Sequence, residues 1–317
     1  MGLKIIGTGR CLPARRVTND ELAAIVDTSD EWIVQKTGIS SRHICTDESL
    51  ADIAGQAALN ALAAAGADPG GVDLIICSTV GGDYLAPSLA CRVAHRIGAA
   101  CPAFDINAAC AGFIYALDIA AAYLAADAAR RILVVSAERM SSYVDWSDRT
   151  TCVLFGDGAG ACLVTGGESL LYSKLTVHNG ADLIEIGTGG GTPFALHKPA
   201  RPYLRMDGPE VFRFAVQAIE REVHAALDEL DMAPGDIDHY VLHQANKRII
   251  DGARARLNQP SEKFPVNINK NGNTSSATIP ILLDEMAHDA RLKPGDTLLL
   301  SAFGAGLTTG TAVLKWE

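Results

Sequence analysis

The sequence predicts an α/β protein built from two packed, mostly parallel sheets with helices between them and outside them. Strand-like apolar runs alternate with helical patterns along the chain, and the same order of elements occurs twice. FGDGAGACLV in the first half is echoed by FGAGLTTGTAVL in the second, and NAACAGF is echoed by NGNTSSA. We therefore expect two related halves, residues 1–166 and residues 167–317.

The first half begins with a strand and turn at residues 3–13. TNDE at residues 18–21 has the Thr and Glu spacing of a capping box, and a second helix start follows at Thr28. The later elements, in order, are an Ala-rich helix at 49–65, a buried strand at 72–79, a helix at 87–98 with Pro87 in its first turn, a buried strand ending at Ile106, a buried helix after Cys110, a buried strand at 130–138, and a strand, Gly-rich turn and strand at 151–166.

The second half repeats this order after a junction near residues 165–169. The glycines of FGDGAG and FGAGLTTG lack the spacing of phosphate-binding loops, so both predict tight hairpins. The expected elements are a strand at 169–180, a loop or lid at 183–205, a helix at 209–230 with Pro209 first, a strand at 237–246, a strand, small-residue run and apolar helix at 263–286, and a strand, Gly-rich turn and strand at 296–316.

Composition narrows the class of protein. The 317 residues, 48% hydrophobic, allow two ordinary domains or one large one. A formal net charge of −10 argues against a general nucleic-acid binder. No apolar run approaches the ~20 residues of a membrane span, and the N-terminus lacks the apolar segment of a secretory signal, so we expect a cytoplasmic protein. The eight cysteines form no CxxC pair, which favours neither a zinc site nor a disulfide framework.

Cys110 lies where the strand-like run ending at Ile106 turns into a helix almost without charge. Small neighbours on both sides would let a substrate approach closely. The N-terminus of a helix stabilises negative charge, so it would favour the thiolate, and its free N–H groups can bind an oxyanion. A lone Cys in such a helix is more often an inert core residue, and only partner residues reverse that interpretation.

His243 and Asn273 also follow strand-like runs, and in α/β folds sites gather at the carboxyl ends of strands. His243 lies in VLHQAN, whereas the other seven histidines lie in loops or on mixed helix faces. Asn273 in NGNTSSA could be a turn or cap residue. Its place in the second half matches the helix start at Cys110, so we expect the two residues to face each other. A Cys, a His and an Asn amide together indicate acyl-thioester chemistry.

Six motifs, CAGF, HQAN, GNTSSA, SDEWI, FGDGAGA and FGAGLTTG, make the whole chain resemble β-ketoacyl-acyl-carrier-protein synthase III. The resemblance implies a thiolase-like five-layer αβαβα fold, a homodimer and a Cys-His-Asn triad that needs no metal or bound cofactor. It implies that Cys110 takes an acyl group from acyl-CoA. His243 and Asn273 would then hold the thioester carbonyl of malonyl-acyl carrier protein while CO₂ leaves, in the initiating condensation of type II fatty-acid synthesis.

The resemblance also assigns the other groups around the thioester. Backbone N–H groups of Cys110 and Ala305 would bind the tetrahedral oxyanion, and Phe303 would cover the nucleophile. Many relatives have Gly at the position of Ala305, and the donor survives the change if the backbone angles suit Ala.

Recognition of CoA is implied by matching motifs as well. Trp32 and Arg149 would sandwich the adenine. Lys36 stands where Arg is common and would contact phosphate less well, because it lacks the bidentate fork. Pro209 replaces a polar residue of many relatives, which leaves one pantetheine hydrogen bond in doubt. Thr28 and Gly208 complete the expected CoA site.

Two further expectations concern the carrier protein and the acyl group. A basic cluster after His243 would bind the acidic carrier protein. Relatives often have a bulky Phe, reaching across the dimer, where this chain has Ala86. With Phe155 also lining the acyl pocket, we expect primers longer than acetyl unless Tyr84 or Leu85 fills the space. The residues of the basic cluster are Lys247, Arg248, Arg254 and Arg256.

Other enzymes and a non-enzyme were weighed against this prediction. A biosynthetic thiolase needs a second cysteine near the C-terminus, and none follows Cys162. The GNTSSA motif and the short chain disfavour relatives of HMG-CoA synthase and polyketide-type enzymes. A non-catalytic partner subunit would typically lose the nucleophile. A synthase III homologue of secondary metabolism, with an unusual starter or acyl acceptor, stays open as the alternative.

Overall fold

Five strands form the first sheet of the computed structural model, which describes residues 2–188 and 203–317. The strand order is β1-β7-β6-β4-β5, with β4 parallel to β5 and β6, and with β7 antiparallel to β1 and β6. The bounds are Lys4–Cys11 for β1, Leu74–Ser78 for β4, Ala103–Ile106 for β5, Arg131–Arg139 for β6 and Asp157–Thr165 for β7.

The second sheet repeats this pattern with one strand fewer. Its order is β11-β12-β13-β8, with β11 parallel to β12 and the other pairs antiparallel. The prediction of mostly parallel sheets is therefore wrong. The central pair of strands in each sheet, β6 with β7 and β12 with β13, is antiparallel. A connection as short as the one between β12 and β13 does not permit parallel pairing. The bounds are Leu170–Val177 for β8, His239–Leu242 for β11, Thr297–Gly304 for β12 and Thr308–Lys315 for β13.

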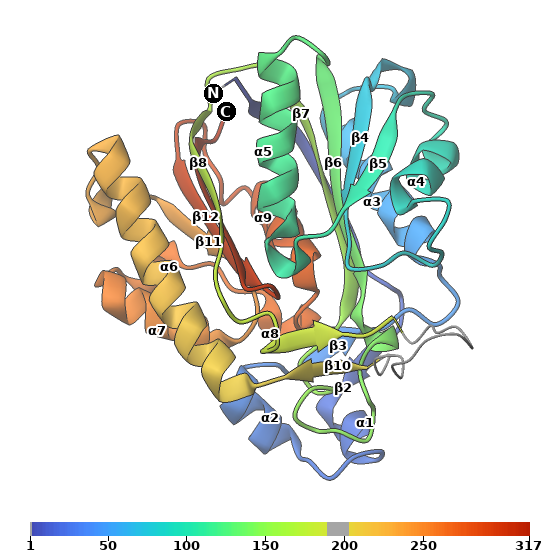
Figure 1. Ribbon diagram of the computed structural model, residues 1–317, viewed down its shortest axis with the longest axis vertical. Helices are drawn as coiled ribbons and strands as arrows, with labels where there is room; N and C mark the ends of the chain where they lie inside the picture. The colour runs from blue at the N-terminus through green and yellow to red at the C-terminus, as the bar shows by residue number, and fades with distance from the viewer. Residues whose placement is uncertain (1, 189–202) are drawn as a thin grey trace.

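Helices occupy three layers around the two sheets (Figure 1). One apolar cluster joins the middle pair to both sheets, and separate clusters join each outer pair to its own sheet. The predicted five-layer αβαβα fold is thereby confirmed. The middle helices are α5 (Gly112–Ala125) and α9 (Thr278–His288), and the outer pairs are α3 (Leu50–Ala64) with α4 (Leu89–Ile97) and α6 (Gly208–Leu230) with α7 (Lys247–Leu257).

Helix starts follow the capping residues, with shifts of one or two positions. Thr18 caps α1 (Asn19–Ala23) in the predicted capping box with Glu21. The cap of α2 (Asp30–Thr37) is Ser29 rather than Thr28, and Ser29 Oγ accepts the Trp32 N–H at 3.2 Å. Ser88 caps α4, so Pro87 precedes the helix instead of lying in its first turn. Helix α6 begins at Gly208, which puts Pro209 second.

Two predicted strands are absent. Residues 151–154 form turns, and the glycines of FGDGAG lie within β7 rather than in a hairpin turn. A Cβ on Gly160 would lie 2.7 Å from the Ile281 nitrogen, so these glycines let α9 pack closely on β7. The strand expected near residues 263–269 is replaced by a 3₁₀ turn, Ser261–Lys263, and the short helix α8 (Ile268–Asn271). Pro265 has no N–H to donate to a ladder, and the Gln244 side chain bonds the Asn267 N–H there.

The expected loop at 183–205 starts and ends as strands. Strand β9 (Ile184–Ile186) pairs antiparallel with β10 (Leu204–Met206), and residues 189–202 lie outside the described residues. A second small ribbon pairs β2 (Arg16–Thr18) with β3 (Ser41–His43). In the described part of the chain, no helix combines the length and apolar character needed to cross a membrane.

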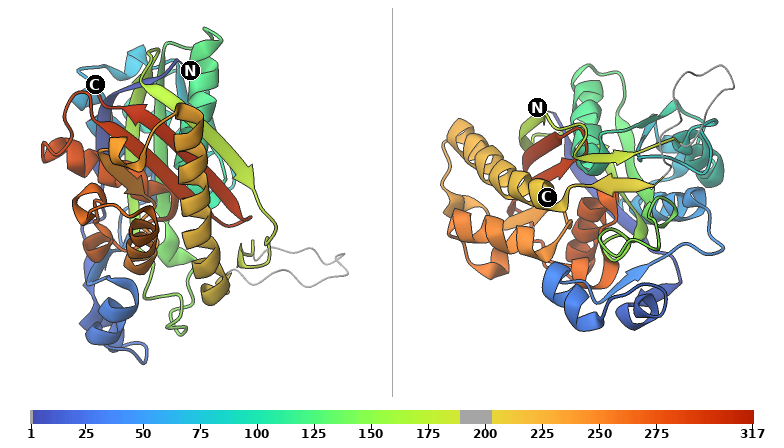
Figure 2. Two further views of the ribbon diagram at one scale, coloured as in Figure 1. Left: turned by 90° about the vertical axis from the view of Figure 1, so that its left-hand side faces the viewer. Right: turned by 60° about the horizontal axis from the view of Figure 1, so that its bottom comes forward.

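Both termini lie at one end of the molecule, where Lys4 Nζ is 3.1 Å from Glu317 Oε2 (Figure 2). The small ribbons and α1 and α2 lie at the other end (Figure 1). Strand β5 is the edge of the first sheet and is only half-buried, contrary to the expected buried strand, because no strand of residues 2–188 or 203–317 pairs with its outer side.

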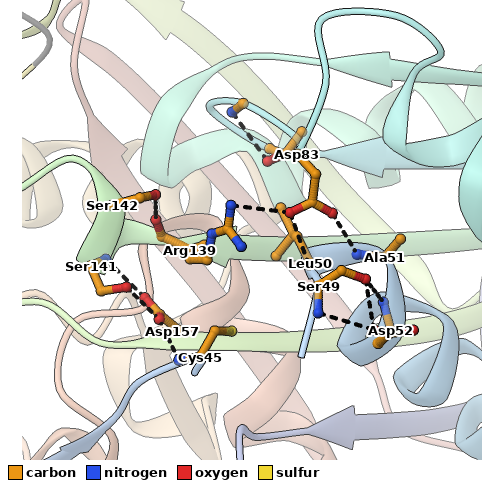
Figure 3. Close-up of polar contacts among 12 residues, drawn as sticks. Cys45, Ser49, Leu50, Ala51, Asp52, Asp83, Arg139, Ser141, Ser142 and Asp157 are labelled. Atoms are coloured by element: carbon orange, nitrogen blue, oxygen red, sulfur yellow. Dashed lines mark hydrogen bonds and ion pairs between the residues drawn. The ribbon is translucent and has the colours of Figure 1, made fainter. Parts of the chain in front are cut away.

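Two carboxylates tie the loops at the end of the first sheet together (Figure 3). Asp157 accepts from the Cys45 N–H at 2.8 Å and from the Ser141 N–H and hydroxyl at 2.9 and 2.6 Å. Asp83 accepts from the Leu50 and Ala51 N–H groups at the start of α3 and pairs with Arg139 at 3.2 Å. A carboxylate at a helix N-terminus is stabilising, so Asp83 fixes the loop that follows β4.

Candidate active site

Cys110, His243 and Asn273 line one cavity of about 680 Å³. It lies between the two sheets, where the turns before α5 and α9 meet the ends of β11 and β12. Most of its wall is apolar, which suits an acyl chain and excludes water from a thioester. Residues from both halves contribute, among them Val80, Met140, Phe155, Ile186, Leu204, Phe212 and Ile249.

Cys110 lies in a 3₁₀ turn, Ala109–Ala111, directly before α5. Ala109 has φ 47°, and the Asn107 side chain accepts its N–H at 3.1 Å. Gly112 lets the helix start against β4, because a Cβ there would lie 1.9 Å from Ser78 Oγ. The thiol contacts Ser275 Oγ at 3.4 Å.

Burial raises the pKa of the Cys110 thiol from 9.0 to about 12, although the hydrogen bond with Ser275 opposes the rise. That change corresponds to ~4 kcal/mol. The N-terminus of a helix stabilises an anion by at most ~2 kcal/mol. Burial of the thiol therefore opposes the thiolate that we expected at this helix start.

His243 follows β11, and its backbone N–H bonds Ser301 O at 2.9 Å. Its Nδ1 is 2.7 Å from Thr278 Oγ1, and its ring packs edge-on against Phe303 with centroids 5.4 Å apart. Burial lowers the pKa of His243 to about 3, so the ring is neutral at physiological pH. Among the described residues, Nε2 has no hydrogen-bond partner, although the residue lines the cavity.

Asn273 is held by its backbone and by its side-chain oxygen. Its N–H bonds Leu154 O at 2.9 Å, and its carbonyl accepts the Gly156 N–H at 3.1 Å. Its Oδ1 accepts the Ser275 N–H at 2.8 Å. Within the described residues its NH₂ group has no hydrogen-bond partner, so that group can donate to a ligand in the cavity.

The residue that matches Cys110 in the second half is Ser276, not Asn273. Ser275 to Ala277 form a 3₁₀ turn before α9, and Ser275 has φ 51°, like Ala109 in the first half. Asn273 therefore matches Asn107, since each accepts an N–H two residues later. The predicted match of Cys110 with Asn273 is therefore wrong by three positions. The expected meeting is nevertheless confirmed, because the two turns pack against each other.

Residues at the end of β12 also lie beside Cys110. Gly304 lies so close that a Cβ there would be 2.7 Å from the Cys110 nitrogen. Ala305 and Phe303 line the cavity beside it, and Ala305 does not have a positive φ, so Ala can replace Gly at this position. Sequence reasoning overlooked Gly304, although a glycine directly before the expected oxyanion donor was a usable signal.

Three other neighbours were also overlooked: Thr278, Ser275 and the fully buried Glu138. Glu138 accepts from Ser276 Oγ at 2.7 Å and from the Val80 N–H at 3.0 Å. Hydroxyls in GNTSSAT carry no signal of their partners, because His243, Glu138 and Cys110 lie 35, 138 and 165 residues away in sequence.

Only some of the residues expected to bind CoA line the cavity. Trp32, Lys36 and Gly208 line the cavity. Arg149 lies over the Trp32 ring, 5.3 Å from its centroid, and bonds the Asp27 carbonyl at 2.9 Å. The two expected adenine-binding side chains therefore contact each other. Thr28 lies outside the cavity wall, and its buried hydroxyl has no partner within the described residues.

The expected basic cluster lies on α7 in three different environments. Arg248 lines the cavity and lies over the Phe212 ring, 5.5 Å from its centroid. Lys247 pairs with Asp251 at 2.6 Å, and Arg256 pairs with Glu220. Arg254 is half-buried on the same helix.

The two residues expected in the acyl pocket lie apart. Phe155 lines the cavity. Ala86 is exposed, in the loop after β4, and does not line the cavity within one chain.

Comparison with known proteins agrees with this geometry. Residues 104–182 match the family 3-oxoacyl-[acyl-carrier-protein] synthase III, and residues 227–316 match its C-terminal family. The chain is 44% identical over 320 residues to β-ketoacyl-[acyl-carrier-protein] synthase III of Aquifex aeolicus, covering 100% of both chains. It is 43% identical to the enzyme of the same name from Xanthomonas campestris, covering 99% of this chain and 98% of the relative.

Solved structures show the same similarity. The Aquifex aeolicus 3-oxoacyl-[acyl-carrier-protein] synthase III superposes with a TM-score of 0.94 over 99% of this chain and 100% of the other. A priming β-ketosynthase from the R1128 polyketide pathway, 35% identical, superposes with a TM-score of 0.93 over 99% and 96%. With full-length identity above 40% and one cavity holding the Cys, His and Asn, this chain belongs to the β-ketoacyl-acyl-carrier-protein synthase III family and is a condensing acyltransferase.

Proposed function

We propose that this enzyme starts type II fatty-acid synthesis. It transfers an acyl group from acyl-CoA to Cys110 and condenses it with malonyl-acyl carrier protein to give 3-oxoacyl-carrier protein, CO₂ and CoA. The observation that carries the proposal is the mostly apolar cavity lined by Cys110, His243 and Asn273 together. The reaction needs no metal or bound cofactor, because backbone and side-chain donors stabilise each oxyanion.

In the first step, the Cys110 sulfur attacks the thioester carbonyl of acyl-CoA. The tetrahedral oxyanion accepts from the backbone N–H groups of Cys110 and Ala305, which Gly304 brings together. The C–S bond to CoA then breaks, and CoA leaves as the thiol with the proton that Cys110 gives up.

In the second step, malonyl-carrier protein occupies the same cavity. The bond to the carboxylate breaks, CO₂ leaves, and the electron pair forms an enolate on the thioester. Its oxygen accepts from the Asn273 NH₂ group and from His243 Nε2. The carbanion attacks the acyl-Cys carbonyl, the C–S bond to Cys110 breaks, and the released sulfur takes up a proton from solvent, which restores the thiol. Phe303 packs against the His243 ring and keeps water from the carbanion.

Both substrates bind around the mouth of the cavity. Trp32 and Arg149 bind the adenine after separating from each other, with Thr28, Lys36 and Gly208 nearby. The basic cluster on α7 (Lys247, Arg248, Arg254 and Arg256) binds the acidic carrier protein. Arg248 supports this proposal best, because it lies at the cavity itself.

The enzyme acts in the cytoplasm as a homodimer. An unpaired edge such as β5 is an incomplete surface, and a second copy would cover it. Leu85 is 105% exposed and Tyr84 is 56% exposed in the loop that Asp83 fixes, which is unusual for large apolar side chains unless a partner covers them.

A test of the two-step assignment uses His243→Ala and Asn273→Ala. Intact mass after acetyl-CoA treatment should still show an acetyl adduct on Cys110, because only the second step builds an enolate. Condensation and CO₂ release from malonyl-carrier protein should fall by about 10²–10³-fold. Condensation by Asn273→Ala at the wild-type rate would contradict the assignment, and an acyl product on another acceptor would favour the secondary-metabolism alternative.

Primer choice rests on Ala86. In a dimer, Ala86 of the second copy would stand at the end of the acyl pocket. Because Ala is smaller than the bulky aromatic residue of many relatives, the pocket would be deeper. We expect butyryl or branched C4–C5 primers to be used with kcat/KM near or above the acetyl value, by up to ~1–3 kcal/mol per well-fitted methylene. A competition assay against acetyl-CoA measures this. Strict acetyl selectivity, with Ala86→Phe behaving like wild type, would contradict it.

A further inference from the structure

A neutral imidazole has one nitrogen with a hydrogen and one without, so the tautomer of His243 decides what the ring offers the cavity. With the hydrogen on Nδ1, Nε2 would only accept hydrogen bonds. With the hydrogen on Nε2, the ring would donate, as an enolate oxygen requires. Burial lowers the pKa of His243 to about 3, so the doubly protonated form, in which both nitrogens donate, is not available at physiological pH.

The partner of Nδ1 is the hydroxyl of Thr278, at 2.7 Å. Both residues are almost completely buried, with exposed fractions of 1% and 2%, so no bulk water competes for this contact. Thr278 Oγ1 also lies 3.1 Å from the Ser275 carbonyl oxygen. The hydroxyl has one proton, so it can donate to only one of these two acceptors at a time.

The Ser275 carbonyl does not need that proton. It already accepts the backbone N–H of Thr278. Among the described residues, Thr278 is the hydrogen-bond partner that the structure gives His243 Nδ1. The shorter contact and the unmet acceptor both favour donation from the hydroxyl to Nδ1, because leaving a buried acceptor unpaired is destabilising.

We propose that Thr278 is a positioning residue that fixes the tautomer of His243, with its hydroxyl donating to Nδ1 so that Nε2 carries the hydrogen and faces the cavity. Nε2 has no hydrogen-bond partner among the described residues, so it is the ring nitrogen left for a ligand, as this role requires. The inference rests on the proposed function, since it supplies one of the two donors to the enolate.

The tautomer also limits what His243 does in the first step. A ring with its hydrogen on Nε2 has no free lone pair on the cavity side, so it does not accept the thiol proton of Cys110. Self-acylation should therefore be nearly independent of Thr278, whereas decarboxylation should depend on it.

The test compares three variants. Thr278→Val keeps the shape and removes the hydroxyl, and Thr278→Ser keeps the hydroxyl. Thr297→Val removes a buried hydroxyl at the far end of β12, away from the cavity, and serves as the matched control. We expect Thr278→Val to lose about 10–10³-fold in CO₂ release from malonyl-carrier protein, in kcat rather than KM, with self-acylation within about threefold of wild type. Thr278→Ser and Thr297→Val should stay within about threefold in both assays.

A direct readout is ¹⁵N NMR of histidine-labelled wild-type enzyme. His243 should show a protonated Nε2 and an unprotonated Nδ1, and Thr278→Val should shift the ring toward the other tautomer. A protonated Nδ1 in the wild type would overturn the proposal, even if Thr278→Val fails to fold. Decarboxylation by a folded Thr278→Val at the wild-type rate would also overturn it. Failure of the proposed function is distinguishable, because His243→Ala would then condense normally whatever the tautomer.

Discussion

The two halves of the molecule carry matching residues around one centre, and the cavity takes Cys110 from the first half and His243 and Asn273 from the second. Ser78 of β4 lies opposite Ser136 of β6, and Leu242 of β11 lies opposite Ser301 of β12. This register makes Thr79 the counterpart of His243. The other matched pairs, first half before second, are Asn107 and Asn273, Cys110 and Ser276, Gly112 and Thr278, and Glu138 and Phe303.

The difference lies in what stands beside each turn. Phe303 of the second half gives the cavity an apolar cover over His243. Its counterpart Glu138 is buried and accepts from Thr79 Oγ1 at 3.3 Å and Ser276 Oγ at 2.7 Å. One side of the centre is therefore an apolar cavity with free donors, and the other is a closed polar network. The exchange of Phe303 for Glu138 is thus one of the differences that make one side a cavity and the other a buried polar network.

The largest contrast is expected between Cys110→Ala and Ser276→Ala. Cys110→Ala should show no acyl adduct by intact mass after acetyl-CoA treatment and no condensation, because the nucleophile is gone. Ser276→Ala should condense within about fivefold of wild type and lose about 1–3 kcal/mol of unfolding free energy, since Glu138 loses a buried partner. An acyl adduct of normal yield on Cys110→Ala would remove the distinction between the two turns.

The closed network should be visible in the pH dependence of stability. Burial raises the pKa of Glu138 from 4.5 to about 7, so its stabilising contribution is complete below about pH 4.5 and is lost as the pH rises through about 7. In Glu138→Gln, the fall in unfolding free energy between pH 5 and pH 8 should be smaller by about 2–3 kcal/mol than in wild type. Urea titrations at both pH values measure this. Parallel pH profiles for the two proteins would show that Glu138 does not titrate as stated.

The smallest effect concerns the helices that follow β4 and β11. Helix α7 carries the basic cluster, and Arg248 lines the cavity, whereas Arg96 on the corresponding helix α4 pairs with Asp52 away from it. Arg254→Glu should raise KM for malonyl-carrier protein about three- to tenfold, with KM for acyl-CoA unchanged and the effect fading at high salt. Arg248→Glu should raise KM for both substrates, because both pass that side chain.

Arg96→Glu is the matched control for these charge reversals. It should change neither KM, because Arg96 does not line the cavity. An increase in KM for the carrier protein equal to that of Arg254→Glu would mean that net charge, rather than the α7 surface, governs binding.

Sequence alone predicted the layered architecture and the three residues that we propose react. Alternation of apolar runs with helical periods depends only on local pattern, which is why most strands and helices were predicted within a few residues. Cys110, His243 and Asn273 each lie in a distinctive local motif at the end of an expected element. Cap positions were less certain, and Ser29 and Ser88 replaced the expected starts because several neighbouring residues can cap a helix.

Tertiary structure alone decided the pairing direction of the strands, the missing strand near Pro265 and the partners of each reactive group. Glycines in β7 looked like a turn because the helix α9 that requires them lies over a hundred residues away in sequence. The contacts of Thr278 with His243 and of Glu138 with Ser276 are non-local hydroxyl bonds, which leave no periodic trace in a sequence. The protonation of Cys110 and His243 was likewise decided by burial, which depends on how completely the two halves close over the cavity.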